Sequence, residues 1–360
     1  MLPCDIGAEL ARVIRAAVAA GDLRPAAAGM TGASGTWRPP PGEPGSAPGT
    51  YATSLPFRLA ARTGQPAGDI AALLAAGLAG TGWISGASVT GPGYLTVAVT
   101  AEALAALAVR VSAAGPACAR SDALRGRLVS APADADLATA ATWAQAHRRL
   151  TAAVSGRLAE AAGAQVFFHS DSERMVRPAP AAQLHPGPAG LAMAFAGADA
   201  IRYALARIPV GRAVGIDAEK SVRRVLGNPF YAVSFAHADA SATLCRAAGL
   251  GLSRGEPAGF RPRLLGCPAQ RALLGVISWL PERVAGAARR RQPHELTRYL
   301  EELARAYLDT TESCPALSSG ERSAPPDAAT ARARLWLADA ARAVLAAGLR
   351  LLGVHAPGRP

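Results

Sequence analysis

The sequence predicts three parts: an α+β domain over residues 1–112, an irregular middle over residues 113–198, and an all-α helical bundle over residues 199–360. Apolar residues recur at helical spacing near the N-terminus and through most of the last part. In the first part, alternating apolar and polar residues flank a Gly-Pro-Gly turn, which is typical of paired strands. Half of the residues are hydrophobic and many of these are alanine, which favours helices and allows a sizeable core.

The α+β domain begins with a helix whose apolar face ends at Gly21. This face consists of Leu10, Val13, Ile14, Ala17 and Val18. Helical spacing returns over residues 55–78, with a break near residues 64–68. The pattern then predicts a strand at residues 87–90, a turn at 91–93, a strand at 95–99 and a helix at 101–111.

The middle is the least regular part of the chain. A helix is expected over residues 137–162, followed by a short strand at residues 165–168. Residues 176–190 are rich in proline and are expected to form a linker. Beyond them the pattern is helical, and four or five helices would form a bundle. Two apolar stripes mark its core: Leu296, Tyr299, Leu300, Leu303 and Tyr307, and Leu337, Ala341, Val344, Leu345 and Leu352.

Positive charge is concentrated in the helical part. The formal net charge is +12, and residues 199–360 carry 23 of the cationic side chains against 14 acidic ones. Such an excess suits a polyanionic partner, because contacts to phosphates dominate nucleic-acid affinity. A solvated basic surface without a ligand explains the charge equally well.

The five cysteines are far apart in the sequence, and no Cys-x-x-Cys pair occurs. Neither a zinc site nor a disulfide framework is therefore expected, and a reducing cytoplasm is the expected compartment. No signal peptide is expected, because Asp5, Glu9 and Arg12 interrupt the first apolar stretch. No apolar run is expected to approach the ~20 residues that span a bilayer, so no membrane is predicted as a partner. The scattered histidines indicate no metal site, and no cofactor is expected.

A series of motifs in the helical part resembles arginyl-tRNA synthetases. Residues 228–238, Asn-Pro-Phe-Tyr-Ala-Val-Ser-Phe-Ala-His-Ala, are similar to the family signature N-P-x-Y-Y-V-Q-Y-A-H-A-R. Residues 294–304, 314–317 and 348–354 continue the match in the order of that family. The resemblance implies a helical bundle of the DALR anticodon-binding type, and with it a tRNA partner.

Two motifs in the first part resemble the same family. Residues 49–54, Gly-Thr-Tyr-Ala-Thr-Ser, are similar to G-D-Y-A-T-N, and residues 89–95 are similar to V-x-G-P-G-F-[IL]. In the family this additional N-terminal domain touches the tRNA elbow. Here Thr50 and Ser54 replace the usual Asp and Asn, which puts the base specificity of such a contact in doubt.

The middle resembles a remnant of the catalytic domain. Residues 156–163 look like the helix that follows the class I HIGH signature, which would fall near residues 142–145. No His-x-Gly-His occurs there, no KMSKS-like loop is present, and Lys220 is the single lysine. The histidines of the HIGH motif stabilise charge during adenylation. Residues 113–198 are also too few for a complete class I domain. The resemblance thus implies a degenerate, truncated α/β domain and no catalytic residues.

The motif match assigns candidate tRNA contacts in both ends of the chain. In the helical part they are Asn228, Tyr231, Phe235, His237, Arg290, Arg291, His294, Arg298 and Arg305. In the first domain they are Tyr51, Thr53 and Ser54. Aromatic rings can stack on unpaired bases while arginines hold the backbone. The alternatives are a bundle core for Tyr231 and Phe235, a structural role for His237, and a solvated helix for the arginines.

Three functions fit these observations. The first is a non-catalytic tRNA-binding paralogue of arginyl-tRNA synthetase that serves as an accessory protein, in one version for an enzyme that uses aminoacyl-tRNA. The second is a diverged arginine–tRNA ligase or a tRNA-dependent transferase, which the missing HIGH and KMSKS signatures disfavour. The third is a protein-interaction module without an RNA role. The sequence does not predict the oligomeric state.

Overall fold

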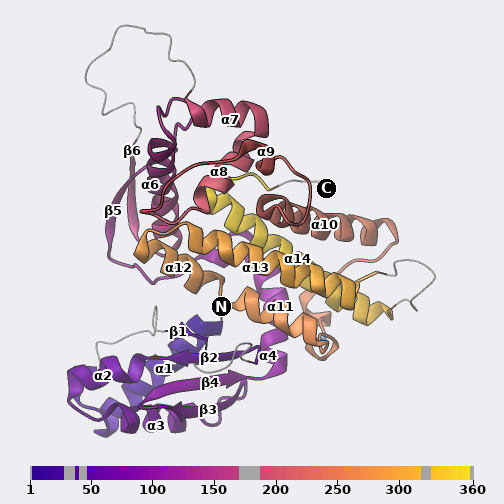
Figure 1. Ribbon diagram of the computed structural model, residues 1–360. Helices are drawn as coiled ribbons and strands as arrows, with labels where there is room; N and C mark the ends of the chain where they lie inside the picture. The colour runs from indigo at the N-terminus through magenta and orange to yellow at the C-terminus, as the bar shows by residue number, and fades with distance from the viewer. Residues whose placement is uncertain (1, 28–36, 40–46, 170–186, 318–325, 357–360) are drawn as a thin grey trace.

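The three predicted parts are recognisable in the computed structural model, which describes residues 2–27, 37–39, 47–169, 187–317 and 326–356. The N-terminal part combines helices with a sheet, the middle joins one long helix to two strands, and the rest is helical (Figure 1). The fold class is therefore α+β, then a small α/β unit, then an all-α domain. Most of the predicted linker at residues 176–190 lies outside the described residues.

The N-terminal part holds a four-stranded antiparallel sheet with strand order β1-β2-β4-β3. Its elements are α1 (Leu2–Ala20), β1 (Trp37–Arg38), β2 (Thr50–Thr53), α2 (Leu55–Thr63), α3 (Ala67–Leu78), β3 (Ile84–Thr90) and β4 (Tyr94–Val99). The predicted N-terminal helix and the helix pair are confirmed, and Gly64 ends α2 in the left-handed conformation. Strands β1 and β2 were not predicted.

The turn between β3 and β4 explains why glycine stands at residue 93. Gly93 has a φ of 134°, and a Cβ there would lie 2.9 Å from the Cβ of Ala67 at the start of α3. On β4, Leu95, Val97 and Val99 are buried, as the alternation predicts. The Gly-Pro-Gly sequence is thus a tight strand turn packed under a helix.

The chain continues through α4 (Ala101–Ala105), α5 (Leu107–Ala114) and the short 3₁₀-helix η2 (Gly115–Ala119). Within the described residues this one stretch, Ala101–Ala119, is long and apolar enough to cross a membrane by length and composition alone. The expectation that no apolar run reaches that length is wrong here, because alanines extend the run past the predicted helix. Leu104, Leu107 and Val111 are buried against the rest of the protein.

The middle forms a βαβ unit of β5 (Leu128–Pro132), α6 (Trp143–Ala161) and β6 (Gln165–His169), with the two strands parallel. The predicted strand is confirmed. The predicted helix begins later than expected, because the Thr142 hydroxyl caps α6 by accepting from the amide of Gln145. Strand β5 was not predicted. Parallel strands joined by a helix are the building block of α/β folds, so the middle is an α/β remnant.

The remaining helices pack around a common core. They are α7 (Pro188–Ala196), α8 (Ala198–Ala206), α9 (Ala218–Ser221), α10 (Pro229–Gly249), α11 (Pro268–Ser278), α12 (Leu280–Arg290), α13 (His294–Ser313) and α14 (Ala328–Leu352). Both predicted apolar stripes, on α13 and α14, are buried. Helix α14 packs against α10, α13 and α11. The predicted bundle is confirmed, with more helices than expected in residues 187–317 and 326–356.

The N-terminal sheet joins the helical part through a buried contact. Tyr51 on β2 is fully buried, and its hydroxyl lies 2.9 Å from the hydroxyl of Ser278 at the end of α11. The ring of Tyr51 also packs 5.3 Å, centroid to centroid, from that of Trp279. Burial raises the pKa of Tyr51, so its hydroxyl stays protonated. Helix α5 and η2 pack on α14, and the parts therefore share one hydrophobic core.

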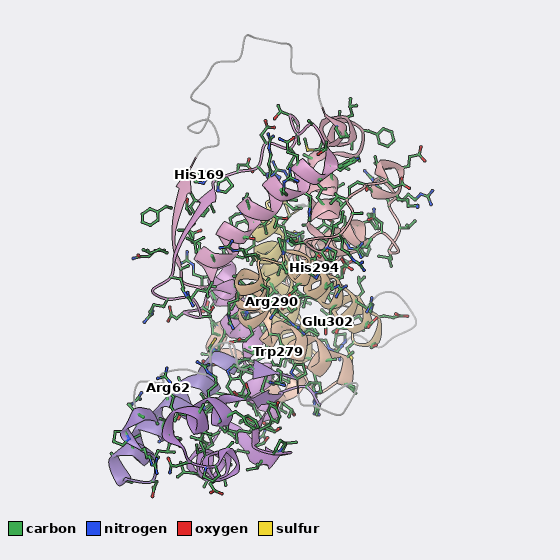
Figure 2. All side chains as sticks on the ribbon, turned by 60° about the vertical axis from the view of Figure 1, so that its left-hand side comes forward. Arg62, His169, Trp279, Arg290, His294 and Glu302 are labelled. Carbon is green, nitrogen blue, oxygen red and sulfur yellow. A yellow bond between two sulfur atoms is a disulfide. The ribbon has the colours of Figure 1, made fainter. Side chains whose placement is uncertain are left out.

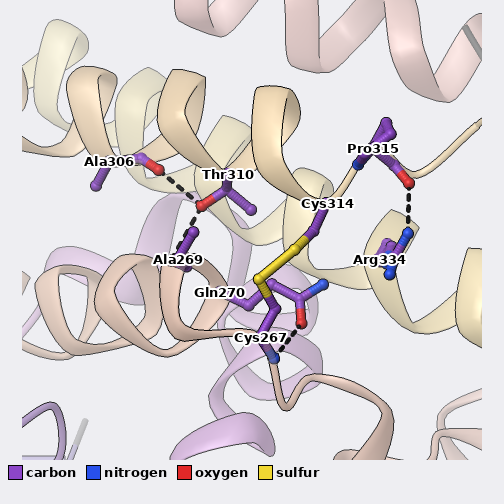
Figure 3. The surroundings of a disulfide bond; sticks show 8 residues. All are labelled: Cys267, Ala269, Gln270, Ala306, Thr310, Cys314, Pro315 and Arg334. Carbon is purple, nitrogen blue, oxygen red and sulfur yellow. Dashed lines mark hydrogen bonds between the residues drawn. A yellow bond between two sulfur atoms is a disulfide. The ribbon is translucent and has the colours of Figure 1, made fainter.

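A disulfide connects Cys267, at the start of α11, with Cys314, at the end of α13 (Figure 3). The expectation that no disulfide forms is wrong for this pair. Their sequence separation of 47 gives no signal of a pairing, but α11 and α13 pack side by side and bring the two helix ends together. Cys4, Cys118 and Cys245 are free.

Candidate nucleic-acid interface

The most exposed aromatic pair of the helical part lies at the beginning of α10. Tyr231 and Phe235 are stacked, with ring centroids 5.8 Å apart and planes inclined by 24°. Both are half-buried, and both line a hollow of about 630 Å³. Two predicted site residues are thus brought together with one face open. Such a pair offers an apolar plane on which an unpaired base can stack.

The rim of the α10 hollow is basic. Arg223 and Arg224 precede α10 and are exposed, and His355 closes the hollow from the C-terminal segment. Neither guanidinium has a partner among the described residues, whereas Asp199, the acid that lines the hollow, faces His355 at 3.2 Å. Neither arginine was among the residues predicted from the sequence. The basic run that begins at Lys220, directly before the α10 motif, was the available signal.

Asn228 has a structural role at this hollow. It caps α10 by accepting from the amide of Phe230, and its side-chain amide donates to the carbonyl groups of Ser221 and Arg223. The sequence predicted that Asn228 contacts tRNA, but with these three bonds made its side chain is not free to bind a base. It instead fixes the loop that presents Arg223.

His237 does not reach the surface. Its side chain is 5% exposed on the inner face of α10, where it has a partner within the protein. A direct RNA contact is therefore ruled out by its position, and the structural alternative holds. Asp239, one turn of α10 from Phe235, accepts a hydrogen bond from the buried hydroxyl of Tyr307 at 2.9 Å. It stands where the family has arginine, and here it stabilises the bundle.

The other predicted arginines lie at the corner between α12 and α13. Figure 2 shows Arg290 and His294 near each other at this corner. Arg290 is ion-paired with Glu295, which holds its side chain along the surface. Burial, together with the nearby charge of Arg298, lowers the pKa of His294, so this ring is neutral at pH 7. Arg298 and Arg305 are exposed on α13, as predicted. None of these residues lines the α10 hollow.

The three predicted contacts of the N-terminal domain are placed differently from one another. Tyr51 and Thr53 are fully buried, because β2 is an inner strand of the sheet. Tyr51 forms the contact with α11, and the Thr53 hydroxyl accepts from the amide of Leu55 at the start of α2. Both are therefore excluded from direct contact with RNA. Ser54 is half-exposed at the beginning of α2 and stays a candidate.

The carboxyl ends of β5 and β6 form the edge where α/β proteins bind ligands. His169 lies at this end of β6, away from the N-terminal domain that carries Arg62 (Figure 2). Asp134 follows β5 and lies 3.2 Å from the guanidinium of Arg202. Burial acts to raise the pKa of Asp134, but the Ala135 amide and the charge of Arg202 outweigh it and lower the pKa below its ordinary value.

The segment that would hold the HIGH histidines is used as a helix cap. The Thr142 hydroxyl accepts from the amide of Gln145, and the Gln145 side chain accepts from the amide of Ala141 at 2.8 Å. Among the described residues, no cluster of three histidine, cysteine or acidic side chains could hold a metal ion.

Two family models match the chain. The model described as "DALR anticodon binding domain" matches residues 256–359, and that described as "Arginyl tRNA synthetase N terminal domain" matches residues 43–99. The first covers α11 to α14 and the second covers the sheet from β2 to β4. Both are the domains that the motifs predicted.

Similar proteins carry the same family name. The arginine–tRNA ligase of Clavibacter sepedonicus is 41% identical over 163 residues, which is 45% of this chain and 28% of that protein. That of Frankia alni is 40% identical over 164 residues, or 45% of this chain and 29% of that protein. The chain thus spans less than a third of the length of these relatives.

Solved structures of the family also match. The Thermus thermophilus arginyl-tRNA synthetase matches with a TM-score of 0.37 and 20% identity, covering 65% of this chain and 40% of that one. The putative arginyl-tRNA synthetase of Campylobacter jejuni matches with a TM-score of 0.38 and 16% identity, covering 60% and 44%. With both terminal domains matched, the chain is an arginyl-tRNA synthetase-like protein that carries the N-terminal domain and the anticodon-binding domain of that family.

Proposed function

We propose that this protein binds tRNA and that the α10 hollow receives unpaired bases of the anticodon loop. The observation that carries the proposal is the stacked, half-exposed pair Tyr231 and Phe235 beside Arg223 and Arg224. Apart from His355, the residues that line the α10 hollow precede residues 256–359, which match an anticodon-binding family, and α10 packs against α13 and α14 of that matched region. Single-stranded RNA is recognised by stacking on aromatic rings while cations hold the backbone. The hollow offers both kinds of contact within a few residues.

We further propose that the protein does not charge the tRNA. In its described residues the middle holds one βαβ unit, and the residues at the HIGH position cap a helix. The protein would act as an accessory protein that holds tRNA or presents it to an enzyme that uses aminoacyl-tRNA. Its compartment would be the cytoplasm, where tRNA is found. The basic rim around an aromatic pair favours this role over a protein-interaction module without RNA.

Replacing Tyr231 by alanine tests the stacking role. We expect tRNA binding to weaken by about 1–3 kcal/mol, the range for one stacked base, and discrimination among anticodon stem-loops to fall. Tyr231→Phe should retain most of the affinity, because the ring remains. The measurement is a titration of stem-loops that differ in the anticodon, beside a thermal melt of each variant.

The melt separates the two roles of Tyr231. A tyrosine that only fills the bundle core would lower the melting temperature when truncated, since large-to-small core substitutions cost several kcal/mol. A lower melting temperature with unchanged stem-loop affinity would contradict the stacking role.

The non-catalytic proposal predicts no arginine-dependent exchange of pyrophosphate into ATP, with or without tRNA. The physical reason is that no histidine pair is available at the start of α6 to stabilise the charge that develops on the triphosphate. The measurement is an exchange assay with an active synthetase as the positive control. Exchange above background that is lost on changing Asp134 or Arg202 would show that the chain retains chemistry.

A further inference from the structure

A second basic hollow lies where the three parts of the chain meet. It has a volume of about 520 Å³, and four arginines line it. Arg58 comes from α2, Arg127 from the residue before β5, and Arg289 and Arg291 from the end of α12. No acidic side chain is among the residues that line it. We call this site the junction hollow.

The junction hollow is distinct from the other sites. It lies at the beginning of β5, whereas nucleotides in α/β folds bind at the carboxyl ends of the strands. None of its residues lines the α10 hollow. The four arginines come from segments far apart in the sequence, so their convergence results from the packing of α12 against α6 and from the position of α2.

The guanidinium groups of the junction hollow lack partners within the protein. In the part of the chain that the structure describes, none of the four forms a hydrogen bond or an ion pair, whereas their neighbours Arg125 and Arg290 are paired with Asp122 and Glu295. The charge of Glu282 acts to raise the pKa of Arg289. Burial and the charges of Arg290 and Arg58 lower the pKa of Arg289, because like charges lie close together.

Two further features distinguish the junction hollow. The hydroxyl of Ser155, on α6, lines it, and this oxygen is buried without a hydrogen-bond partner. Arg291 has a φ of 52°, and among the described residues it is the only one other than glycine with a positive φ. Glycine is the ordinary residue at such a helix end, so arginine is kept there against a backbone cost. Four unpaired cations and a free hydroxyl form a set of donors without an acceptor.

We propose that the junction hollow binds a phosphate group, and that in the complex with tRNA this phosphate belongs to the RNA backbone outside the anticodon loop. The inference rests on the proposed tRNA binding for the source of the phosphate, but not for the chemistry of the site. Arginine forks match phosphate oxygens with paired hydrogen bonds, and the Ser155 hydroxyl can donate to the same group. A free polyphosphate would satisfy the same donors.

Arg291→Gly provides a sharp test, because it removes a cation and relieves the backbone at once. We expect its melting temperature to equal or exceed that of the parent, while its tRNA affinity falls by about eightfold at 100 mM salt, the value for one lost phosphate contact. The double variant R58Q/R127Q should lose more tRNA affinity than Arg291→Gly, because it removes two cations. R15Q/R261Q, which removes two exposed arginines elsewhere, serves as the control of equal charge and should bind as the parent does.

A second arm uses pyrophosphate as the probe in thermal melts. If pyrophosphate raises the melting temperature of the parent but not that of Arg291→Gly, the phosphate site is supported. This holds even if the parent binds no tRNA. In that case the phosphate comes from a free polyphosphate, and only the proposed tRNA binding fails. The inference is overturned if two results occur together. The parent, Arg291→Gly and R58Q/R127Q bind tRNA with equal affinity, and pyrophosphate raises the melting temperature of all of them equally or of none. The proposed function would then remain intact.

Discussion

The double variant R223Q/R224Q should bind tRNA about two-hundredfold more weakly than the parent at 50 mM salt and about twentyfold more weakly at 200 mM. Each contact between an arginine and a phosphate contributes a slope of about −0.9 to the dependence of log K on log salt, so two lost contacts flatten the slope by about 1.8. Both side chains are exposed at the rim of the α10 hollow and have no partner within the described residues, so folding should be unaffected.

Filter-binding titrations at several salt concentrations measure both the affinity and the slope. R15Q/R261Q again controls for net charge. If R223Q/R224Q retained the parental slope, the rim of the α10 hollow would not contact phosphates, and the basic surface would serve another partner.

Reduction of the disulfide between Cys267 and Cys314 should lower the free energy of unfolding by about 2–4 kcal/mol. The bond joins cysteines with a sequence separation of 47 and closes a loop that holds α11, α12 and α13. Closing such a loop reduces the entropy of the unfolded chain. Denaturant titrations with and without a reductant, and of Cys267→Ser, measure the loss. In a reducing cytoplasm the protein would have the lower free energy of unfolding of the form with two free thiols.

Cys245→Ser is the matched control, because Cys245 is exposed and unbonded. Its unfolding should respond to the reductant as that of the parent does. Equal stability of the parent in both conditions would mean that the two thiols lie close together without forming a bond that matters for folding.

The sequence predicted those elements whose pattern is local. The alternation on β4 and the stripe on α13 identified a buried face in each case, and both faces are in the core. Strand β5 was missed because Leu128–Pro132 is short, and its pairing partner β6 begins only at Gln165, beyond a whole helix. Parallel pairing of this kind depends on a crossover that a local pattern does not reveal.

The candidate site was predicted only in part for a similar reason. The motif around α10 located Tyr231 and Phe235, and the structure adds which face is open. A motif cannot tell a buried member from an exposed one, and Tyr51 and His237 proved to be core residues. The junction hollow joins Arg58, Arg127 and Arg289 from three parts of the chain, and nothing short of the tertiary structure brings them together.

The contact of Tyr51 with Ser278 links the two matched domains, so we expect them to unfold as one cooperative unit. A cut after residue 112 would divide α5, which packs on α14, and it would separate Tyr51 from Ser278. Heating should therefore unfold the sheet and the bundle in a single transition, and proteases should find few sites at the boundary between them.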